Sequence, residues 1–393
     1  MNARSDSFPM CLTQQLPTGL LEVAVHGGAD ELDELLGFAA RANAKRGFLF
    51  VSKVLGKHWP VRPSRMLAIH ERLAAGVPEA PGPVLFIAMA ETAVGLGQGV
   101  FEAWLRTHPG QDALFLQTTR YRAGTGPIIE FEEAHSHAPR QFLHLPAGAH
   151  EQALLTNART IVLVDDEAST GNTFLNLTQA CRRLNPALAR VHLAVLANFM
   201  GAAATEALSA RFGLPATMGA LLSGEYRFTA GACPVDAAPA QRYDAQAERG
   251  AGTAFGRLGL ARSLRTPDSL ARALAAGIGA NEKVLVLGTG EFMHPSTLLG
   301  AALEQLGLDV MVQSTTRSPI LTWGAVGHCL TLPDNYGEGI PNFLYNVAPG
   351  QYQHVLVCHE TPAGEALHAF ARSLGARLFH YHDEDDIEEV PVR

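Results

Sequence analysis

Two adjacent carboxylates, Asp165 and Asp166, follow the apolar run TIVLV and precede a short stretch of small polar residues. The run is predicted to be a buried strand, so both acids would stand at its carboxyl end, before a turn over residues 167–173. Ionised carboxylates at such a position are costly unless they meet a cation or hydroxyl donors. The vicinal hydroxyls of a ribose are such donors, and Mg²⁺ takes oxygen ligands. We therefore expect Asp165 and Asp166 to bind a sugar diol, with Mg²⁺ as a further ligand.

The turn after these acids has the composition of a phosphate site. Residues 172–185 have apolar side chains at helical spacing, so the turn would lead into a helix. Backbone N–H groups at a helix N-terminus bind phosphate well when Ser and Thr hydroxyls stand beside them. A diol clamp next to a monophosphate cradle fits a ribose 5-phosphate. The residues expected in the cradle are Ala168, Ser169, Thr170, Gly171, Asn172 and Thr173.

The elements that would position this motif alternate between strand and helix. The predicted strands of the first half are 84–90, 113–121, 160–166 and 191–199, and the predicted helices are 97–108 and 172–185. Such an alternation implies a parallel sheet covered by helices on both faces. It restarts in the second half, with strands at 283–290, 309–318 and 354–362 and helices at 297–307 and 365–375. The predicted fold class is α/β, with a second, smaller, Rossmann-like α/β domain.

Length and composition set the domain organisation. A chain of 393 residues exceeds what one compact core usually takes. The stretch 232–269 is rich in Ala, Gly and Pro without a sustained period, which is typical of a connector. We therefore expect a first domain over 1–231 and a second over 270–393.

Charge and cysteine usage exclude several classes of protein. The chain is 47% hydrophobic and 17% charged, with a formal net charge of −8, which argues against a nucleic-acid partner. No apolar run reaches the length of a membrane span, and the first residues lack the pattern of a signal peptide. Five scattered cysteines form no disulfide framework, so a reducing cytoplasm is expected. The acidic run HYHDEDDIEEV reads as a solvated tail, and a basic cluster with Lys53 and Lys57 is either part of an anion site or an exposed face.

The apolar run, the two acids and the small residues ending in T-G-x-T resemble the phosphoribosyl-pyrophosphate (PRPP) loop of type I phosphoribosyltransferases. The resemblance implies a phosphoribosyltransferase-like sheet, in which Asp165 and Asp166 face the ribose hydroxyls and hold Mg²⁺, directly or indirectly. Residues 168–173 would then hold the 5-phosphate. Purine-type members often carry an aspartate at the position of Ser169, where it handles the base proton. Serine cannot do this at neutral pH, which weakens an interpretation as a purine-salvage enzyme.

The resemblance also implies a second loop, after the first core strand, that binds pyrophosphate through backbone amides. Residues 90–97 occupy that place, and small residues there let the backbone approach an anion closely. The expected pyrophosphate-binding residues are Ala90, Glu91, Thr92, Ala93 and Gly95. The alternative is a tight strand-to-helix turn without a ligand.

Residues 118–145 lie where related enzymes carry a flexible hood over the site. Arg120 and Arg122 would pair with pyrophosphate as catalytic residues. An acid or base would come from Glu132, Glu133, His135 or His137, and the two histidines also have the spacing of a metal pair. A mobile loop without chemistry is the alternative.

The segment VQSTTRSPI (312–320) resembles the signature of the TRSP domain. That domain is found C-terminal to a distinct phosphoribosyltransferase branch, which is associated with bacterial tellurite-resistance-type stress gene clusters. Three loops of the second domain are candidates for an anion or acceptor site, although each is also explained as an ordinary turn. The first of them, GTGEFMHP, lacks the third glycine of the dinucleotide fingerprint. The candidate residues are Gly288, Thr289, Gly290, Glu291, Thr316, Arg317, Ser318, Asp334, Tyr336 and Glu338.

The expected function is Mg²⁺-dependent transfer of a phosphoribosyl group from PRPP to a base-like acceptor, with release of pyrophosphate. The product would be a nucleoside-like metabolite made in a bacterial stress response. The alternative is a regulator that binds PRPP or a nucleotide and does no chemistry. Related folds commonly pair through the sheet edge and hood. The oligomeric state is left undecided, with a homodimer as one alternative. Tyr226 and Phe228 either stack on a base or pack within a strand core.

Overall fold

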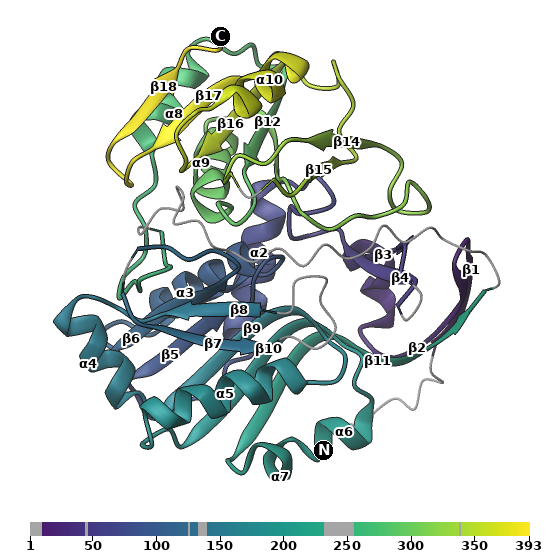
Figure 1. Ribbon diagram of the computed structural model, residues 1–393, viewed down its shortest axis with the longest axis vertical. Helices are drawn as coiled ribbons and strands as arrows, with labels where there is room; N and C mark the ends of the chain where they lie inside the picture. The colour runs from purple at the N-terminus through teal and green to yellow at the C-terminus, as the bar shows by residue number, and fades with distance from the viewer. Residues whose placement is uncertain (1–9, 44–45, 125, 133–139, 232–254, 338) are drawn as a thin grey trace.

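The computed structural model describes residues 10–43, 46–124, 126–132, 140–231, 255–337 and 339–393. Two α/β units stack on each other, with the larger sheet in the lower part of Figure 1 and the smaller sheet above it. The first unit contains the strands β1 (Met10–Leu16), β2 (Gly19–Gly27), β3 (Leu36–Ala40), β4 (Phe48–Ser52), β5 (Val84–Ala88), β6 (Ala113–Thr119), β7 (Ile128–Glu132), β8 (Arg140–His144), β9 (Thr160–Ala168), β10 (Arg190–Asn198) and β11 (Ala216–Ala230). Its helices are η1 (Ala29–Glu31), α1 (Leu32–Leu35), α2 (Pro63–Ala75), α3 (Val94–Thr107), α4 (Ala149–Asn157), α5 (Asn172–Leu184), α6 (Ala202–Glu206) and α7 (Leu208–Phe212).

The larger sheet has the strand order β1-β2-β11-β10-β9-β5-β6-β8-β7 among the described residues. The five strands from β11 to β6 run parallel. Antiparallel strands extend the sheet at both ends. The predicted parallel core is therefore confirmed, and its near-continuous apolar strands suit burial on both faces. The antiparallel extensions and the β3–β4 hairpin were not anticipated.

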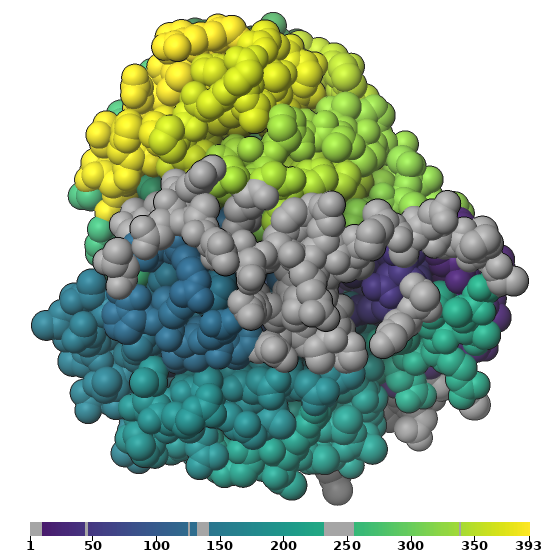
Figure 2. All heavy atoms as spheres, in the orientation of Figure 1, coloured from purple at the N-terminus to yellow at the C-terminus, as the bar shows by residue number. Residues whose placement is uncertain are grey.

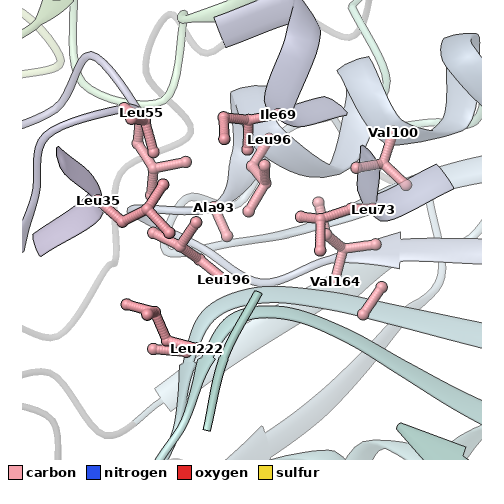
Figure 3. Close-up of a cluster of buried hydrophobic side chains, with 14 of the residues drawn as sticks. Leu35, Leu55, Ile69, Leu73, Ala93, Leu96, Val100, Val164, Leu196 and Leu222 are labelled. Atoms are coloured by element: carbon pink, nitrogen blue, oxygen red, sulfur yellow. The ribbon is translucent and has the colours of Figure 1, made fainter. Parts of the chain in front are cut away.

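The core on one face of this sheet lies between the strands and helices α2 and α3. Figure 3 shows Val164 of β9 beside Leu73 of α2 and Leu96 and Val100 of α3. The alternate side chains of β9 enter a second cluster on the other face, with residues of α4, α5 and α7. Fully burying a side chain of this kind stabilises the fold by roughly 1.5–3 kcal/mol. Both clusters end at the carboxyl edge of the strands, where apolar residues give way to polar ones.

The second unit is a smaller sheet of the order β13-β12-β16-β17-β18 within the described chain. The first four strands are parallel, and β18 returns antiparallel to β17. A separate β14–β15 hairpin lies beside it. The elements are α8 (Asp268–Ala275), β12 (Lys283–Gly288), α9 (His294–Gln305), β13 (Asp309–Ser314), β14 (Cys329–Leu332), β15 (Asn342–Tyr345), β16 (His354–His359), α10 (Glu365–Leu374), β17 (Arg377–Tyr381) and β18 (Ile387–Val390).

The two units share an extensive interface, and Figure 2 shows the second unit, in green and yellow, above the first. Helix α9 covers β12 and β13 and also contacts α2 and α3 of the first unit. Val61 and Val312 exchange both backbone hydrogen bonds, at 3.0 and 2.7 Å. Beside them Arg62 pairs with Asp309 at 2.7 Å. The loops at the carboxyl ends of both sheets consequently meet.

Part of the predicted connector 232–269 packs between the two units. Residues 232–254 lie outside the described residues, but Leu260 exchanges two backbone hydrogen bonds with Phe115 of β6, at 2.8 and 2.9 Å. Arg257 is only 1% exposed. The described end of this segment therefore belongs to the packed interior, while the domain boundaries themselves stay a prediction.

The acidic run near the C-terminus is not the solvated tail that its composition indicated. It forms the β17–β18 hairpin, and Glu384 pairs with Arg262 and Arg265 of the segment before α8. Arg265 also pairs with Asp385. The acids are thus partly neutralised by arginines more than a hundred residues away in sequence. Among the helices of the described residues, none is long and apolar enough to cross a bilayer.

Candidate active site

Strand β9 carries Asp165 and Asp166 to the carboxyl edge of the larger sheet, where both side chains are partly exposed. The N–H of Asp166 donates to Asp165 Oδ1 at 2.9 Å. The strand continues to Ala168, beyond the predicted end at 166, because Glu167 and Ala168 keep their ladder positions opposite β10. The predicted turn is correspondingly shorter. The acids remain accessible at the edge where ligands bind in open α/β sheets.

Residues 169–171 form a tight link from β9 into α5. Gly171 caps the helix with a φ of +71°, a left-handed conformation that favours glycine. A Cβ there would lie 3.1 Å from Met200 Cε and 3.2 Å from Arg211 Nη1. Thr170 and Asn172 are exposed, and Ser169 and Thr173 are partly exposed. The predicted cradle residues are therefore gathered at a helix N-terminus, as a phosphate site requires.

Arg211 of α7 holds this link from the side, a contact that the sequence did not reveal. Its guanidinium donates to the Thr170 carbonyl oxygen and to Asn172 Oδ1. Charged donors make stronger hydrogen bonds than neutral ones, so Arg211 fixes the link on both sides of Gly171. The two partners are about forty residues from Arg211 in sequence, and no local pattern predicts their contact.

Glu167, directly after the two aspartates, is occupied by an ion pair. Arg46 Nη2 lies 2.7 Å from both carboxylate oxygens of Glu167. Burial raises the pKa of Glu167, and the charge of Arg46 opposes that effect. Arg46 is 121 residues from Glu167 in sequence, and no local pattern predicts their contact. Glu167 is therefore committed to Arg46 in this structure.

The second loop follows β5, which lies directly beside β9 in the sheet. The peptide between Ala90 and Glu91 is cis. The Ala90 N–H donates to Thr118 Oγ1 at 2.8 Å, and the Ala90 carbonyl accepts from Gln141 Nε2 at 3.0 Å. Strands β6 and β8 thus hold this loop next to the acids of β9. Glu91 and Thr92 are partly exposed, whereas Ala90 and Ala93 are buried.

Helix α3 begins at Val94, so the loop is shorter than the predicted 90–97. Gly95 lies in the first turn of the helix, where a Cβ would come within 3.1 Å of Met293 Cβ in the second unit. At Gly97 a Cβ would lie 2.3 Å from Ala88 Cβ. These glycines permit close packing against the second unit and against β5. Gly95 therefore faces protein, and the open part of the loop is confined to Glu91 and Thr92.

Lys57 explains why an acid is tolerated at position 91. Its ammonium lies 2.7 Å from Glu91 Oε1 and donates to the Gly290 carbonyl oxygen at 2.6 Å. Lys57 is 1% exposed. Burial raises the pKa of Glu91, but Lys57 and then Arg317 outweigh it and lower the pKa to about 2. The basic cluster was predicted to be either part of an anion site or an exposed face. Lys57 is not on an exposed face, because it is buried in this network.

The two predicted hood arginines have different surroundings. The backbone N–H of Arg120 donates to Glu291 Oε1 at 2.9 Å, and Thr119 Oγ1 donates to Glu291 Oε2 at 2.6 Å. The charge of Arg120 contributes to lowering the pKa of Glu91. Arg122 instead lies over the Phe142 ring, 4.6 Å from its centroid, and 3.5 Å from Glu130. Arg120 is thus near the pyrophosphate loop, whereas Arg122 packs on the β7–β8 hairpin.

A buried ionic network joins the second unit to this edge. Arg257 reaches Glu360 at 2.6 and 2.7 Å and Glu291 at 3.3 Å, with all three side chains at most 2% exposed. Burial alone would lower the pKa of Arg257, and the carboxylates of Glu360 and Glu291 raise it well above the usual range. The Tyr336 hydroxyl lies 2.8 Å from Glu360 Oε1. Glu291 and Tyr336 were predicted candidates, whereas Arg257 and this use of Glu360 were not anticipated.

Other second-unit candidates are divided between the site and the scaffold. Arg317 lies over the Tyr121 ring, 4.3 Å from its centroid, and so faces the base of the hood. In contrast, the Gly290 N–H donates to Thr315 and its carbonyl accepts from Lys57, which leaves that loop little room for a phosphate. Asp334 accepts from the N–H groups of Tyr336 and Gly339 within a turn.

The remaining candidates serve packing or lie beyond the described residues. Ser318 Oγ accepts from Arg41 at 2.7 Å, and Thr316 exchanges backbone hydrogen bonds with Phe343. Thr289 is buried, and a Cβ on Gly288 would lie 2.1 Å from the Phe292 carbonyl oxygen. Glu133, His135, His137 and Glu338, together with the side chain of Glu132, lie outside the described residues.

Tyr226 and Phe228 belong to an aromatic cluster. Tyr226 lies 4.9 Å from Phe48 and 5.6 Å from Phe50, between ring centroids, and Phe228 lies 5.2 Å from Phe48. Both residues are in β11, paired with β2. Of the two alternatives for these rings, the structure favours packing within the strand core.

The donor set at the end of β9 suits Mg²⁺. Asp165 and Asp166 offer carboxylate oxygens only, and hard oxygen ligands are what Mg²⁺ prefers. Both are partly exposed, which leaves room for water and for a substrate oxygen. The residues present therefore fit this ion.

Comparison with known families agrees with this geometry. Residues 35–225 match the family model described as "Phosphoribosyl transferase". Its range includes β5, β9 and the loops that follow them, so the protein is an enzyme of the phosphoribosyltransferase class. Residues 254–374 match the "TRSP domain C terminus to PRTase_2". The chain therefore combines a phosphoribosyltransferase domain with a C-terminal TRSP domain. No curated protein matches the chain in sequence.

Several solved structures resemble the first domain distantly. An adenine phosphoribosyl transferase from Trypanosoma brucei, in complex with AMP, pyrophosphate and ribose-5-phosphate, is 14% identical over 49% of this chain and 78% of that chain, with a TM-score of 0.35. The enzyme from Giardia lamblia, complexed with 9-deazaadenine, is 16% identical over 49% and 97%, with a TM-score of 0.33. An orotate phosphoribosyltransferase from Francisella tularensis is 14% identical over 48% and 80%, with a TM-score of 0.29. Similarity at such low sequence identity and TM-score does not assign a substrate to this protein.

Proposed function

We propose that the protein transfers a 5-phosphoribosyl group from PRPP to a nitrogen of a base-like acceptor and releases pyrophosphate. The observation that carries this proposal is the juxtaposition of two loops at one sheet edge. Parallel strands β9 and β5 are hydrogen-bonded neighbours, with Ala88 opposite Val164. They bring the Asp165–Asp166 pair beside the loop at Glu91 and Thr92. A diol clamp next to a loop that would hold pyrophosphate is the arrangement that PRPP requires.

Each part of PRPP has a candidate partner in this arrangement. Asp165 and Asp166 would accept hydrogen bonds from the ribose hydroxyls, and the N-terminus of α5 would hold the 5-phosphate. Arg120 would face the pyrophosphate from the neighbouring strand β6. Its backbone is held by Glu291 of the TRSP domain, so that domain would help to position a residue of the reaction.

The reaction would depend on positioning and electrostatics. The acceptor nitrogen forms a bond to C1 of the ribose as the bond from C1 to pyrophosphate breaks. Positive charge then grows on the sugar ring, where Asp165 and Asp166 stand, and negative charge grows on the leaving group, where Arg120 stands. Mg²⁺, held by Asp165 and Asp166 directly or through water, would neutralise part of the pyrophosphate charge when bound.

Finer parts of the proposal rest on the resemblance to the TRSP-linked branch. They are a nucleoside-like product, a role in a tellurite-resistance-type bacterial stress response and a cytoplasmic location. The TRSP match supports the branch but not the stress role itself. Deleting the gene is expected to raise sensitivity to tellurite, and complementation by a D165N/D166N variant is expected to fail. Full complementation by that variant would contradict a catalytic role in the response.

The decisive experiment is to incubate the protein with PRPP, Mg²⁺ and a panel of nitrogenous bases while pyrophosphate release is followed. Turnover with an acceptor is expected, and D165N or D166N should reduce kcat/KM by about a hundredfold or more. Asp309→Asn is a matched control, because that carboxylate is exposed and pairs with Arg62 away from the site. Tight PRPP binding without turnover for any acceptor would instead favour the regulatory alternative.

A further inference from the structure

A cluster of metal-binding side chain types lies on the TRSP domain, in the acidic run that the proposed function does not use. His380, His382 and Glu388 have ligand atoms that all lie within 4.8 Å of one another. The rings of His380 and His382 are 4.0 Å apart between centroids, and His382 Nε2 lies 3.5 Å from Glu388 Oε2. Two imidazoles and a carboxylate are ligands for first-row transition metals rather than for Mg²⁺.

The strand register places His380 and Glu388 on one face of the sheet. His380 of β17 is directly opposite Glu388 of the antiparallel strand β18. Directly opposite side chains project from the same face, and so does a side chain two residues along. His382 lies in the turn just after β17, where its N–H donates to the Asp386 carbonyl oxygen at 2.9 Å. Backbone pairing thus fixes His380 opposite Glu388, and the hairpin turn holds His382 beside them.

A backbone contact prepares His380 to act as a ligand. Its Nε2 lies 3.3 Å from the Glu360 carbonyl oxygen. A carbonyl only accepts, so this nitrogen carries the proton and Nδ1 keeps its lone pair. Metal-binding histidines commonly donate their other N–H in this way.

The row continues inward to a buried histidine. His359 of β16 is opposite His380, and their rings are stacked with centroids 5.0 Å apart. His359 is fully buried, its Nδ1 contacts the Thr361 carbonyl oxygen at 2.7 Å, and its Nε2 has no hydrogen-bond partner. This stacked ring supports His380 from the interior, while His382 and Glu388 face solvent. The cluster therefore has a fixed inner side and an accessible outer side.

We infer that His380, His382 and Glu388 form a binding site for a divalent first-row transition metal of the Zn²⁺ type at the carboxyl edge of the TRSP sheet. Three protein ligands leave at least one coordination position open, which distinguishes the site from closed structural zinc sites. An open position suits a water molecule or an anionic substrate group. The site is connected to the buried ionic network, because Glu360 contacts His380 through its carbonyl and Arg257 through its carboxylate.

The test is zinc binding by the untagged full-length protein after treatment with a chelator. Competition between the protein and a chromophoric chelator for ZnCl₂ gives the stoichiometry and affinity. Visible absorption of the CoCl₂-loaded protein reports the ligand geometry. We expect saturable binding of one ion per chain that a millimolar excess of Mg²⁺ does not displace. The variants H382N and E388Q should each weaken Zn²⁺ binding at least about tenfold and change the Co²⁺ spectrum.

These variants are expected to fold, because the His382 and Glu388 side chains are 44% and 62% exposed. His354→Asn is a matched control: His354 contacts Glu282 at 2.8 Å near the start of β16, at the opposite edge of the sheet. It should bind zinc like the unmodified protein. The inference is overturned if no saturable binding occurs, or if H382N and E388Q bind zinc as tightly as the H354N control. In the second case the zinc resides elsewhere, and His135 and His137 would be the next residues to substitute.

Discussion

Lys57 offers a sharp test of the electrostatics at the domain interface. The Lys57→Met change keeps most of the side-chain volume but removes the ammonium that lies 2.7 Å from Glu91 and 2.6 Å from the Gly290 carbonyl oxygen. Lowering the pKa of Glu91 from 4.5 to about 2 corresponds to about 3 kcal/mol of stabilisation. Removing one partner of a buried pair costs about 3–5 kcal/mol. Because Arg317 still faces Glu91, we expect a loss of about 3 kcal/mol at pH 7.

The Lys57–Glu91 pair also determines the direction in which the free energy of unfolding changes with pH. The folded-state pKa of Glu91 is lowered, so its stabilisation is present above the unfolded pKa and is lost as the pH falls from about 4.5 toward 2. The K57M variant has already lost that contribution. The difference in stability between the two proteins should therefore shrink by about 1 kcal/mol between pH 7 and pH 4.

The assay is urea unfolding followed by tryptophan fluorescence at both pH values. Lys53→Met is the matched control, since Lys53 is four residues earlier, donates to the Asp33 carbonyl oxygen at an exposed position and lies 5.9 Å from the centroid of the Trp59 ring. It should cost less than about 1 kcal/mol. The double variant K57M/E91Q should recover part of the loss, because it leaves no buried carboxylate at position 91 without its ammonium partner. Equal costs for K57M and K53M, or a K57M cost that does not change with pH, would refute this account of the pair.

Three further changes test the site. Glu291→Gln weakens the contact that holds the Arg120 backbone, so kcat/KM for pyrophosphate release should fall about tenfold to a hundredfold; unchanged kinetics would remove the TRSP domain from the reaction. Arg211→Ala frees the link around Gly171, and the Kd for PRPP, measured by calorimetry, should rise about tenfold; an unaltered Kd would show that the link needs no anchor. Gly171→Ala forces a left-handed φ on a residue with a Cβ and should lower the free energy of unfolding by about 1–2 kcal/mol; a neutral effect in thermal unfolding would contradict that cost.

The sequence predicted those features that local patterns encode. Apolar runs located the parallel strands, and the acids at 165–166 with the small residues after them located one half of the site. Gly171 could be assigned a turn role because its neighbours have turn chemistry. The start of α3 was misjudged, because the glycines at 95 and 97 look like a loop when their packing partners are unknown. Those partners include Met293 in the other domain and Ala88 in a neighbouring strand.

The rest depended on contacts between residues far apart in the chain. Arg257 lies in a segment whose composition indicates a connector, yet it is buried between Glu291 and Glu360. Nothing near Arg257 in sequence names these partners, because the pairing follows from how two separate sheets meet. Lys57 is a similar case: its contact with Glu91 forms only when the segments after β4 and β5 are folded together.

The backbone pairing of Leu260 with β6 bears on any attempt to separate the two halves of the protein. The backbone N–H and C=O of Phe115 form hydrogen bonds with a segment that follows the phosphoribosyltransferase domain in the chain. A shortened protein that stops before residue 254 would leave this part of the β6 edge without its hydrogen-bond partner. Exposed strand edges tend to pair with other chains. The excised catalytic half would consequently tend to self-associate and lose solubility, whereas a version that retains residues 255–262 would keep its border covered.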